Sequence, residues 1–440
     1  CAAVPTADTH HKKAKSQAVR NAAPAHAKDV SGGTEAVIVT GTREFGKKAR
    51  DSISPIDVVS SRQITSTGQP TLRDALSLLL PSLTVPTAGF DAGALTDTIA
   101  LRGLNPNETL VLVDGKRRHT TANIYADPGP SQGATPVDID MLPMSMIDHI
   151  EVLRDGASAQ YGSDAIAGVV NIITKKQDHG LSMRSNTGIT SEGDGFQQGV
   201  YLDGGFNLNN RGYVHIGGDF VHQDHAFRSG KDNRTNQYTN PVLSEPEQPR
   251  ESVALTAGYD ITETVQAYAS ATYAHRHAES YQNYRLPSSL SAYPGYAAKY
   301  PYGYSPILGL EENDYELTAG FKGMLAGWHW DLSTVYGRDF DRFDALSTIN
   351  SAVYKADGRT PTNFYNAQGY NNSQWTSSFD LSRKFNFSFW PHSINVAGGA
   401  AYRYESYSMG TGSADSIAGT GADGIPGTTT YNAGNWSRDV

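Results

Sequence analysis

Few residues of this chain stand at spacings that support catalysis. A G-x-G-x-x-G string at Gly419–Gly424 has the form that holds a dinucleotide, but such a string works only where a helix follows it. Here Ile425-Pro426-Gly427 follows, so the helix N-terminus that would hold a pyrophosphate is missing. The sequence contains no G-x-S-x-G elbow, H-E-x-x-H helix or P-loop. We therefore predict that the protein is not an enzyme and carries no cofactor.

Metal-binding patterns are equally weak. The single cysteine, Cys1, excludes an internal disulfide framework, a cysteine-based zinc site and an iron–sulfur cluster. His10 and His11 have no further ligand at useful spacing, which favours a solvated tract over a metal site. We predict no metal ligands.

Composition bounds the class of protein. The 440 residues carry 36 basic and 45 acidic side chains, and the net charge of -9 argues against a nucleic-acid-binding surface over the whole chain. The longest apolar run, Ala75–Leu80, ends at Pro81, far short of the roughly 18 residues of a transmembrane helix. If the chain crosses a membrane, it must use strands. Its 24 tyrosines, apolar with one polar end, suit membrane interfaces.

Residues 1–34 are rich in Ala, Lys and His and have no apolar period, so we predict that they are disordered. The chain begins at cysteine, and two interpretations stay open. Cys1 is the lipidated first residue of a lipoprotein, or Cys1-Ala2-Ala3 is the small-residue end of a signal peptide.

The segment from 35 to about 176 mixes short apolar runs with one helix and reads as a compact α+β domain. Thr71 can cap a helix whose apolar residues recur with a helical period, and Pro81 closes it. Leu110–Val113 suits a buried strand that enters a tight turn at Asp114-Gly115. Further strands are predicted at Ile147–Leu153 and Val169–Ile173.

From about 177 onward the pattern alternates with period two, one parity being apolar and the other carrying Asp, His and Gly. Long polar stretches separate some segments, notably 225–250, 277–313 and 408–440, whereas Asn209-Asn210-Arg211 is a tight connection. Alternation of long loops and short turns is typical of an outer-membrane barrel. A soluble sandwich rarely needs loops of that length.

Four segments together resemble the plug of the TonB-dependent outer-membrane receptors, and the strands after them resemble the start of that family's barrel. They are Ile99–Gly103, Leu110–Arg117, Ile147–Gly156 and Ala165–Thr174. The resemblance implies an α+β plug domain followed by antiparallel transmembrane β-barrel strands. The implied divisions are a disordered segment 1–34, a TonB box-like segment 35–41, a plug 42–176 and barrel strands 177–440.

Several motif residues carry the resemblance and are expected to hold the plug together rather than to perform chemistry. Glycines there permit turns and close backbone approach, and Arg154, with Glu151 and Asp155, is expected to form ion pairs within the plug or against the barrel wall. The set is Arg102, Gly103, Asp114, Gly115, Glu151, Arg154, Asp155, Gly156, Tyr161, Gly162, Gly168 and Asn171.

The segment at the family's TonB box position is rich in β-branched residues and suits edge-on pairing with a strand of the energising partner. It consists of Glu35, Ala36, Val37, Ile38, Val39, Thr40 and Gly41. An ordinary first strand of the plug is the alternative.

The resemblance also places ligand contacts in two apical loops, Phe90–Thr98 and Arg117–Pro136. Arg and Tyr there suit a carboxylate-bearing ligand or a metal chelate, although Arg117 and Arg118 equally suit a turn cap or a solvated face. The candidate ligand residues are Phe90, Arg117, Arg118, His119, Tyr125 and Asp127.

The implied function is uptake of a scarce ligand, most often an iron–siderophore, across the outer membrane of a Gram-negative bacterium. The implied partners are a TonB-type protein in the periplasm, the small-molecule ligand and outer-membrane lipid. A signalling receptor and a non-transporting adhesive surface protein are the alternatives. About nine strands are counted against the family's 22, so we expect a part of a longer protein or, failing that, a truncated non-functional product.

Overall fold

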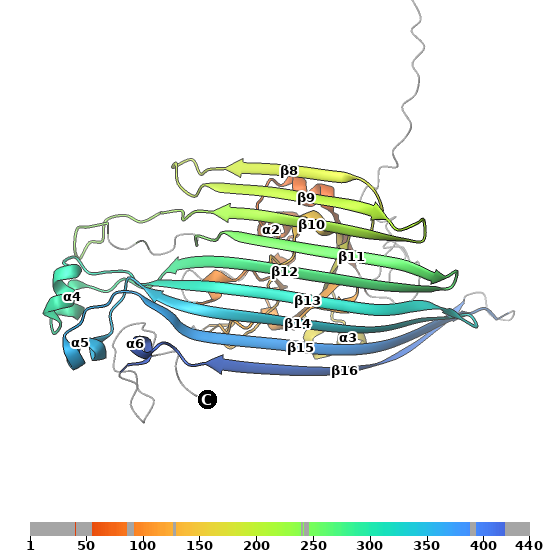
Figure 1. The fold of residues 1–440 in the computed structure, drawn as a ribbon. Helices are drawn as coiled ribbons and strands as arrows, with labels where there is room; N and C mark the ends of the chain where they lie inside the picture. Colours follow the sequence, from red (N-terminus) through yellow and green to blue (C-terminus); the bar gives the residue numbers. More distant parts are fainter. Residues whose placement is uncertain are drawn as a thin grey trace, which may run out of the picture. The chain divides into compact units, whose positions relative to one another are not determined.

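The computed structural model describes Thr40 and residues 55–85, 92–125, 129–238, 241, 246–387 and 393–418, all of which lie in residues 32–440, the second of the chain's two units. Two large sheets dominate this part of the chain, one of five strands and one of nine. We call the part that contains the first sheet, residues 55–176, the N-terminal domain, and the second sheet the strand wall (Figure 1).

The five-stranded sheet forms the core of the N-terminal domain in the order β1-β6-β7-β4-β5. All five residues of β4 are buried, as its unbroken apolar run predicts. The turn after it places Asp114 and Gly115 at positive φ, 50° and 78°, so that β5 can pair back on β4. The strands are β1 (Ile56–Ser60), β4 (Thr109–Val113), β5 (Lys116–Arg117), β6 (Ile147–Leu153) and β7 (Gly168–Thr174), beside a small pair β2 (Leu83–Thr84) and β3 (Ala100–Leu101).

Helix α2 (Leu72–Leu79) covers this sheet where the sequence predicts a helix. Its N-cap, Thr71, accepts a hydrogen bond from the backbone N–H of Asp74 at 3.2 Å. The domain also holds α1 (Ser61–Ser66), α3 (Ser158–Tyr161) and the 3-10 turns η2 (Ala92–Leu95), η3 (Pro106–Glu108), η4 (Met144–Met146) and η5 (Ser163–Ala165). Among all residues that the structure describes, no helix has the length and apolar character needed to cross a bilayer.

The strand wall is antiparallel, and each strand pairs with its neighbours in sequence (Figure 1). Its strands are β8 (Leu181–Gly188), β9 (Gln197–Asn207), β10 (Gly212–Gln223), β11 (Arg250–Thr262), β12 (Val265–Tyr281), β13 (Ile307–Leu325), β14 (Trp328–Leu346), β15 (Phe364–Phe385) and β16 (Ile394–Gly410). Among the described residues β8 and β16 each pair on one side only, so this part of the chain does not close a barrel.

Some connections are more ordered than the sequence suggests. The polar stretch 277–313 is not all loop, because β12 runs to Tyr281 and β13 starts at Ile307. Between them lie η6 (Pro287–Leu290) and α4 (Pro294–Lys299), while α5 (Ser351–Asp357) and α6 (Ala414–Ile417) follow later strands. Tyrosines 293, 296 and 304 pack there in a small core of their own, which explains how a polar composition still folds.

In the strand wall the outward-facing side chains are apolar and the inward-facing ones are polar, the reverse of the arrangement in a soluble protein. Side chains that face away from the N-terminal domain are apolar and substantially exposed, such as Phe220, Leu317 and Leu332 at 46%, 54% and 50%. The alternate side chains, which face the domain, are charged and buried; they include Asp203, Asp219, Arg250, Arg276, Glu312, Asp314, Glu316, Asp339 and Asp341. An exposed apolar face of that extent requires lipid or protein against it, and apolar-out, polar-in alternation is the pattern of an outer-membrane barrel strand.

Candidate functional site

The face between the N-terminal domain and the strand wall is held by buried ion pairs. The first is centred on Arg276 of β12, which is fully buried. Its guanidinium donates to Asp138 at 2.6 Å and to Asp97 at 3.2 Å, both in the N-terminal domain, and also to Glu312 of β13. One wall arginine therefore joins two aspartates of the domain to the wall.

The second ion-pair group begins where β5 ends. Arg118 pairs with Asp314, lies 3.4 Å from Glu316 and donates to the Thr272 hydroxyl at 3.0 Å. The next residue, His119, places Nε2 2.8 Å from Asp314 and Nδ1 3.0 Å from Glu316. A Cβ on Gly337 of β14 would overlap this imidazole, whose Cε1 would lie 2.9 Å away, so the absence of a side chain at Gly337 leaves room for the ring against the wall.

His119 makes the contact with the wall dependent on pH. Burial lowers the pKa of this imidazole, but Asp314 and Glu316 outweigh burial and raise the pKa of His119 to about 9. A group whose folded-state pKa lies above its unfolded value, about 6.5 for histidine, stabilises fully below pH 6.5 and loses that contribution as the pH rises through 9.

We therefore expect the protein in detergent to lose on the order of 3 kcal/mol of unfolding free energy from this group between pH 6 and pH 10. His119→Gln removes the titration but leaves the other ionisable groups in place. Urea unfolding of both proteins across this range measures the difference in slope, and parallel curves would refute the assignment.

A third contact fixes α2. Asp140 accepts hydrogen bonds from the backbone N–H groups of Leu72, at 2.6 Å, and Arg73, at 3.4 Å, at the N-terminus of that helix. Arg250 of β11 lies 3.6 Å from the other oxygen of Asp140. Burial is the largest cause that raises the pKa of Asp140, to about 8. The wall thus reaches the helix through one shared carboxylate.

Three of the predicted ligand residues are buried. Arg118 and His119 are buried in the contact with the wall, at 2% exposure each, and neither caps a turn nor faces solvent. Tyr125 is buried, and its hydroxyl lies 2.9 Å from both Thr96 Oγ1 and Thr98 Oγ1, so it ties one predicted apical loop to the other. Phe90 and Asp127 lie outside the described residues.

Arg117 has the most accessible position of the described candidates. It pairs with Asp164 and donates to the backbone oxygen of Tyr161 at 2.9 Å. Asp164 also binds Arg403 of β16 at 3.0 Å, so two guanidinium groups share one carboxylate. Arg403 also lies 3.3 Å from Glu405, so two guanidinium groups and two carboxylates meet beside the cavity that these residues line.

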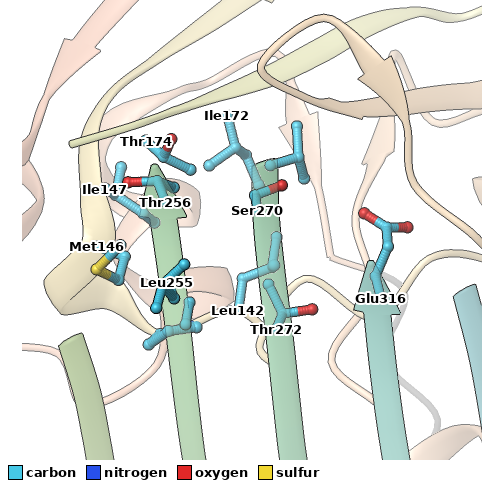
Figure 2. Close-up of a pocket in the computed structure, with 13 residues that line it drawn as sticks. Leu142, Met146, Ile147, Ile172, Thr174, Leu255, Thr256, Ser270, Thr272 and Glu316 are labelled. Carbon is cyan, nitrogen blue, oxygen red and sulfur yellow. The ribbon is translucent and has the colours of Figure 1, made fainter. Parts of the chain in front are cut away.

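Described residues of the N-terminal domain and the wall line two of the cavities in this part of the chain. One, shown in Figure 2, is lined by apolar residues such as Leu142, Met146 and Ile172 and holds only about 20 Å³, which is room for a single water. The other is polar, holds about 380 Å³ and is lined by Arg117, Arg118 and residues of β15 and β16. Only the second reaches the size at which small-molecule sites begin, about 300 Å³.

The motif residues expected to hold the domain together lie in its turns and sheet. Arg102 donates to the Ile166 carbonyl at 2.9 Å, and the Asn171 side chain accepts from Gly115 N–H at 3.0 Å. Arg154 forms its ion pair within the plug, with Asp57 of the neighbouring strand β1 at 2.9 Å, because β1 pairs antiparallel along β6.

The Glu151 carboxylate binds Thr40, which lies more than a hundred residues earlier in the chain. Thr40 donates to its carboxylate from the backbone N–H, at 2.7 Å, and from the hydroxyl. Thr40 is the only member of the predicted TonB box-like segment among the described residues, and it is fully buried. The other six members lie outside them.

Comparison with known proteins identifies the N-terminal domain. Residues 48–169 match the TonB-dependent Receptor Plug Domain family. The chain carries a TonB-dependent receptor plug. The resemblance read from the motifs is thus confirmed, as is the fold class of a plug followed by antiparallel barrel strands.

Relatives agree with this assignment. The chain is 39% identical over 157 residues to an iron-regulated outer membrane virulence protein and 33% identical over 156 residues to the vitamin B12 transporter BtuB, both of Vibrio cholerae serotype O1. Each match spans 35% of this chain and 22% or 23% of the relative. By name these relatives are an outer membrane protein and a transporter, in agreement with the predicted outer-membrane location and with the prediction that the chain is not an enzyme.

Solved structures share the fold across most of the chain. The siderophore receptor PirA from Acinetobacter baumannii superposes with a TM-score of 0.59 at 16% identity, covering 82% of this chain and 49% of that one. A variant of the ferric enterobactin receptor PfeA from Pseudomonas aeruginosa superposes with a TM-score of 0.58 at 14% identity. That match covers 81% of this chain and 49% of the receptor. The chain therefore spans about half the length of these receptors.

The wall residues that hold the plug were missed in the sequence, although a signal was present. Charged residues recur on one parity of single strands, as in Glu312, Asp314 and Glu316 of β13 and Asp339 and Asp341 of β14. Carboxylates on alternate residues of these strands, on the face toward the plug, predict that the plug supplies partners for them. They do not predict which plug residues those partners are.

Proposed function

We propose that this protein is a TonB-dependent outer-membrane receptor that takes up a scarce small molecule, an iron–siderophore in the first instance, with energy from the inner-membrane proton gradient. The observation that carries the proposal is a plug domain packed on the charged inner face of a wall whose outer face is apolar. That arrangement suits a gate in a lipid-facing pore.

The contacts of Thr40 support a route by which a pull on the TonB box-like segment reaches the plug. A pull on residues 35–41 reaches Glu151 through two hydrogen bonds, and Glu151 lies on β6, between β1 and β7 in the plug sheet. A partner that pairs edge-on with this segment would therefore load the interior of the plug rather than a surface loop. The buried ion pairs with the wall are the contacts that such a load must break.

Deletion of Glu35–Gly41 tests energised transport. Uptake of radiolabelled ferric enterobactin or vitamin B12, the ligands named for relatives, is expected to fall to background in cells, while binding to the cell surface is retained. Deletion of residues 20–26, of equal length, serves as the control and should leave uptake unchanged. Unchanged uptake without residues 35–41 would refute the proposal, and loss of a transcriptional response alone would favour the signalling receptor.

The ligand assignment has its own test. The guanidinium groups of Arg117 and Arg403 line the polar cavity and can donate to an anionic chelate in exchange for their carboxylate partners, Asp164 and Glu405. Tyr125 holds the two apical loops together. We expect Arg117→Ala with Tyr125→Ala to weaken ligand binding about tenfold or more, since a hydrogen bond to a charged group contributes about 1.5–3 kcal/mol. Membrane insertion should not change.

The matched control is Arg154→Ala, which removes a plug arginine that pairs with Asp57 and does not line the cavity. Titration of the same labelled chelates onto whole cells measures all three proteins. Equal affinity in the double variant and the wild type would remove this loop from the site.

A further inference from the structure

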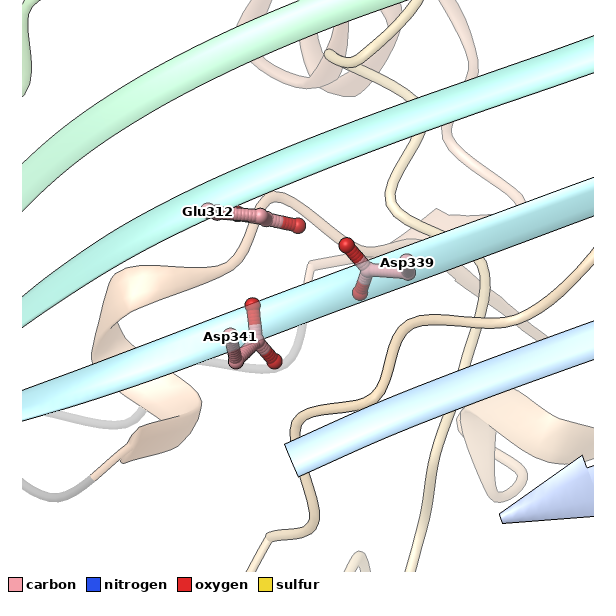
Figure 3. A group of neighbouring side chains, drawn as sticks. All are labelled: Glu312, Asp339 and Asp341. Carbon is pink, nitrogen blue, oxygen red and sulfur yellow. The ribbon is translucent and has the colours of Figure 1, made fainter. Parts of the chain in front are cut away.

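Three carboxylates converge on the inner face of the wall, where the sequence predicts no metal. They belong to Glu312 of β13 and to Asp339 and Asp341 of β14, and Figure 3 shows their oxygens turned toward one another. One oxygen from each lies within 4.8 Å of the other two, and Glu312, Asp339 and Asp341 are all fully buried.

Their oxygens lack partners to an unusual degree. Neither oxygen of Asp341 has a hydrogen-bond partner among the described residues, and the same holds for Glu312 Oε1 and Asp339 Oδ1. Buried carboxylate oxygens are normally hydrogen-bonded, because an unpaired buried charge carries a large desolvation cost. Four unpartnered oxygens on three carboxylates that approach one another this closely therefore indicate a missing positive group.

Neighbouring protein charges do not supply that group. The Arg276 guanidinium is already shared among Glu312, Asp97 and Asp138. The second oxygen of Asp339 accepts from the Thr121 hydroxyl at 2.8 Å and from Ala122 N–H at 2.6 Å, which are neutral donors. Counting Arg73, which binds Asp97, two guanidinium groups face five carboxyl groups, so the acidic side chains here outnumber the basic ones.

We propose that Glu312, Asp339 and Asp341 bind one hard divalent cation, Ca²⁺ in preference to others, between the wall and the plug. Ca²⁺ is held by oxygen ligands at 2.3–2.6 Å, so two oxygens that bind one ion lie no more than about 5 Å apart. The three oxygens here, all within 4.8 Å of one another, meet that limit. An all-carboxylate donor set disfavours the softer ions that prefer nitrogen or sulfur. Mg²⁺ keeps several waters and demands octahedral geometry, which a fully buried site suits less well.

Such an ion would stabilise the contact between the wall and the second apical loop. Asp339 also holds Thr121 and Ala122, which follow closely on His119 in the second apical loop. An ion bound by the three carboxylates would therefore hold Asp339 in the position in which it binds this loop. The inference concerns cation binding alone and does not depend on whether the protein transports a ligand.

Equilibrium dialysis with radioactive Ca²⁺ tests the site in the full-length protein, purified in detergent and stripped with a chelator. We expect one buried equivalent in the wild type and at least a tenfold loss of affinity in Asp341→Asn. Asp331→Asn removes a carboxylate from the same strand, one that already pairs with Lys116 at 2.9 Å, and should bind Ca²⁺ like the wild type.

Thermal unfolding keeps the test decisive if one variant folds poorly. Ca²⁺ should raise the unfolding midpoint of the wild type and of Asp331→Asn, and should do so much less in Asp341→Asn and Glu312→Gln. No bound Ca²⁺ at millimolar concentration, or equal binding by wild type and Asp341→Asn, would overturn the site. A third outcome would also overturn the site: Asp341→Asn is more stable than the wild type, and Ca²⁺ does not stabilise the wild type. That result would show that protons on the carboxyl groups, and not a cation, neutralise this cluster.

Discussion

Replacement of Arg276 by methionine is expected to lower the free energy of unfolding by roughly 3–5 kcal/mol, the usual cost of removing one partner from a buried ion pair. Methionine keeps much of the length of the side chain but leaves Asp97, Asp138 and Glu312 without their shared cation in a fully buried space. Because two of these carboxylates belong to the plug and one to the wall, the loss should also loosen the plug. Urea unfolding in detergent measures the first effect, and limited proteolysis of the plug measures the second.

Arg342→Met is the matched control for this substitution. Arg342 lies on β14 with its side chain 44% exposed, and its carboxylate neighbours, Glu311 and Asp344, are 3.8 and 3.9 Å away. Surface pairs of that kind contribute about 0–1 kcal/mol, so this change should be nearly silent. A similar small effect for Arg276→Met would mean that the plug does not depend on this ion pair.

Substitution of Gly168 by alanine is the second change with a large expected effect. Gly168 starts β7 at φ +143°, a conformation that other residues rarely adopt. A Cβ there would overlap the backbone oxygen of Leu153 and lie 2.7 Å from Leu101 Cδ1. Backbone strain of about 1–3 kcal/mol and overpacking of a similar size add, so we expect a loss of roughly 3–5 kcal/mol.

Gly129→Ala provides the comparison, because no atom lies within 4 Å of a Cβ at that position of the plug. Amounts of folded receptor in the outer membrane, quantified together with the unfolding midpoint, should fall for Gly168→Ala and stay near the wild-type level for Gly129→Ala. Equal amounts of both variants would show that β7 shifts to accept the methyl group.

Local features of the plug were predictable because the forces that set them act over a few residues. The cap at Thr71 and the helical period of the following apolar residues suffice to predict α2. Asp114-Gly115 marks the turn after β4 since both residues tolerate positive φ. The period-two alternation predicts the wall strands, although β13 already starts at Ile307, inside the polar stretch 277–313.

Pairings across the plug and wall were not predictable in the same way. Arg154 has acidic neighbours in sequence, yet its partner is Asp57, which strand pairing brings alongside. Arg118 and His119 read as loop residues open to a ligand, but Asp314 and Glu316, almost two hundred positions away, enclose them. A charged residue in a short motif looks solvated until the surface that buries it is known.

The order of residues alone therefore specified a plug with a defined turn and helix pattern, a run of antiparallel strands and a chain without enzyme motifs. The tertiary structure decided which charges meet, which predicted ligand residues are buried, and where unpartnered carboxylates gather. The physical reason is range. Propensity, capping and periodicity are properties of neighbouring residues, whereas burial and ion pairing depend on strands far apart in the sequence that approach only in the folded protein.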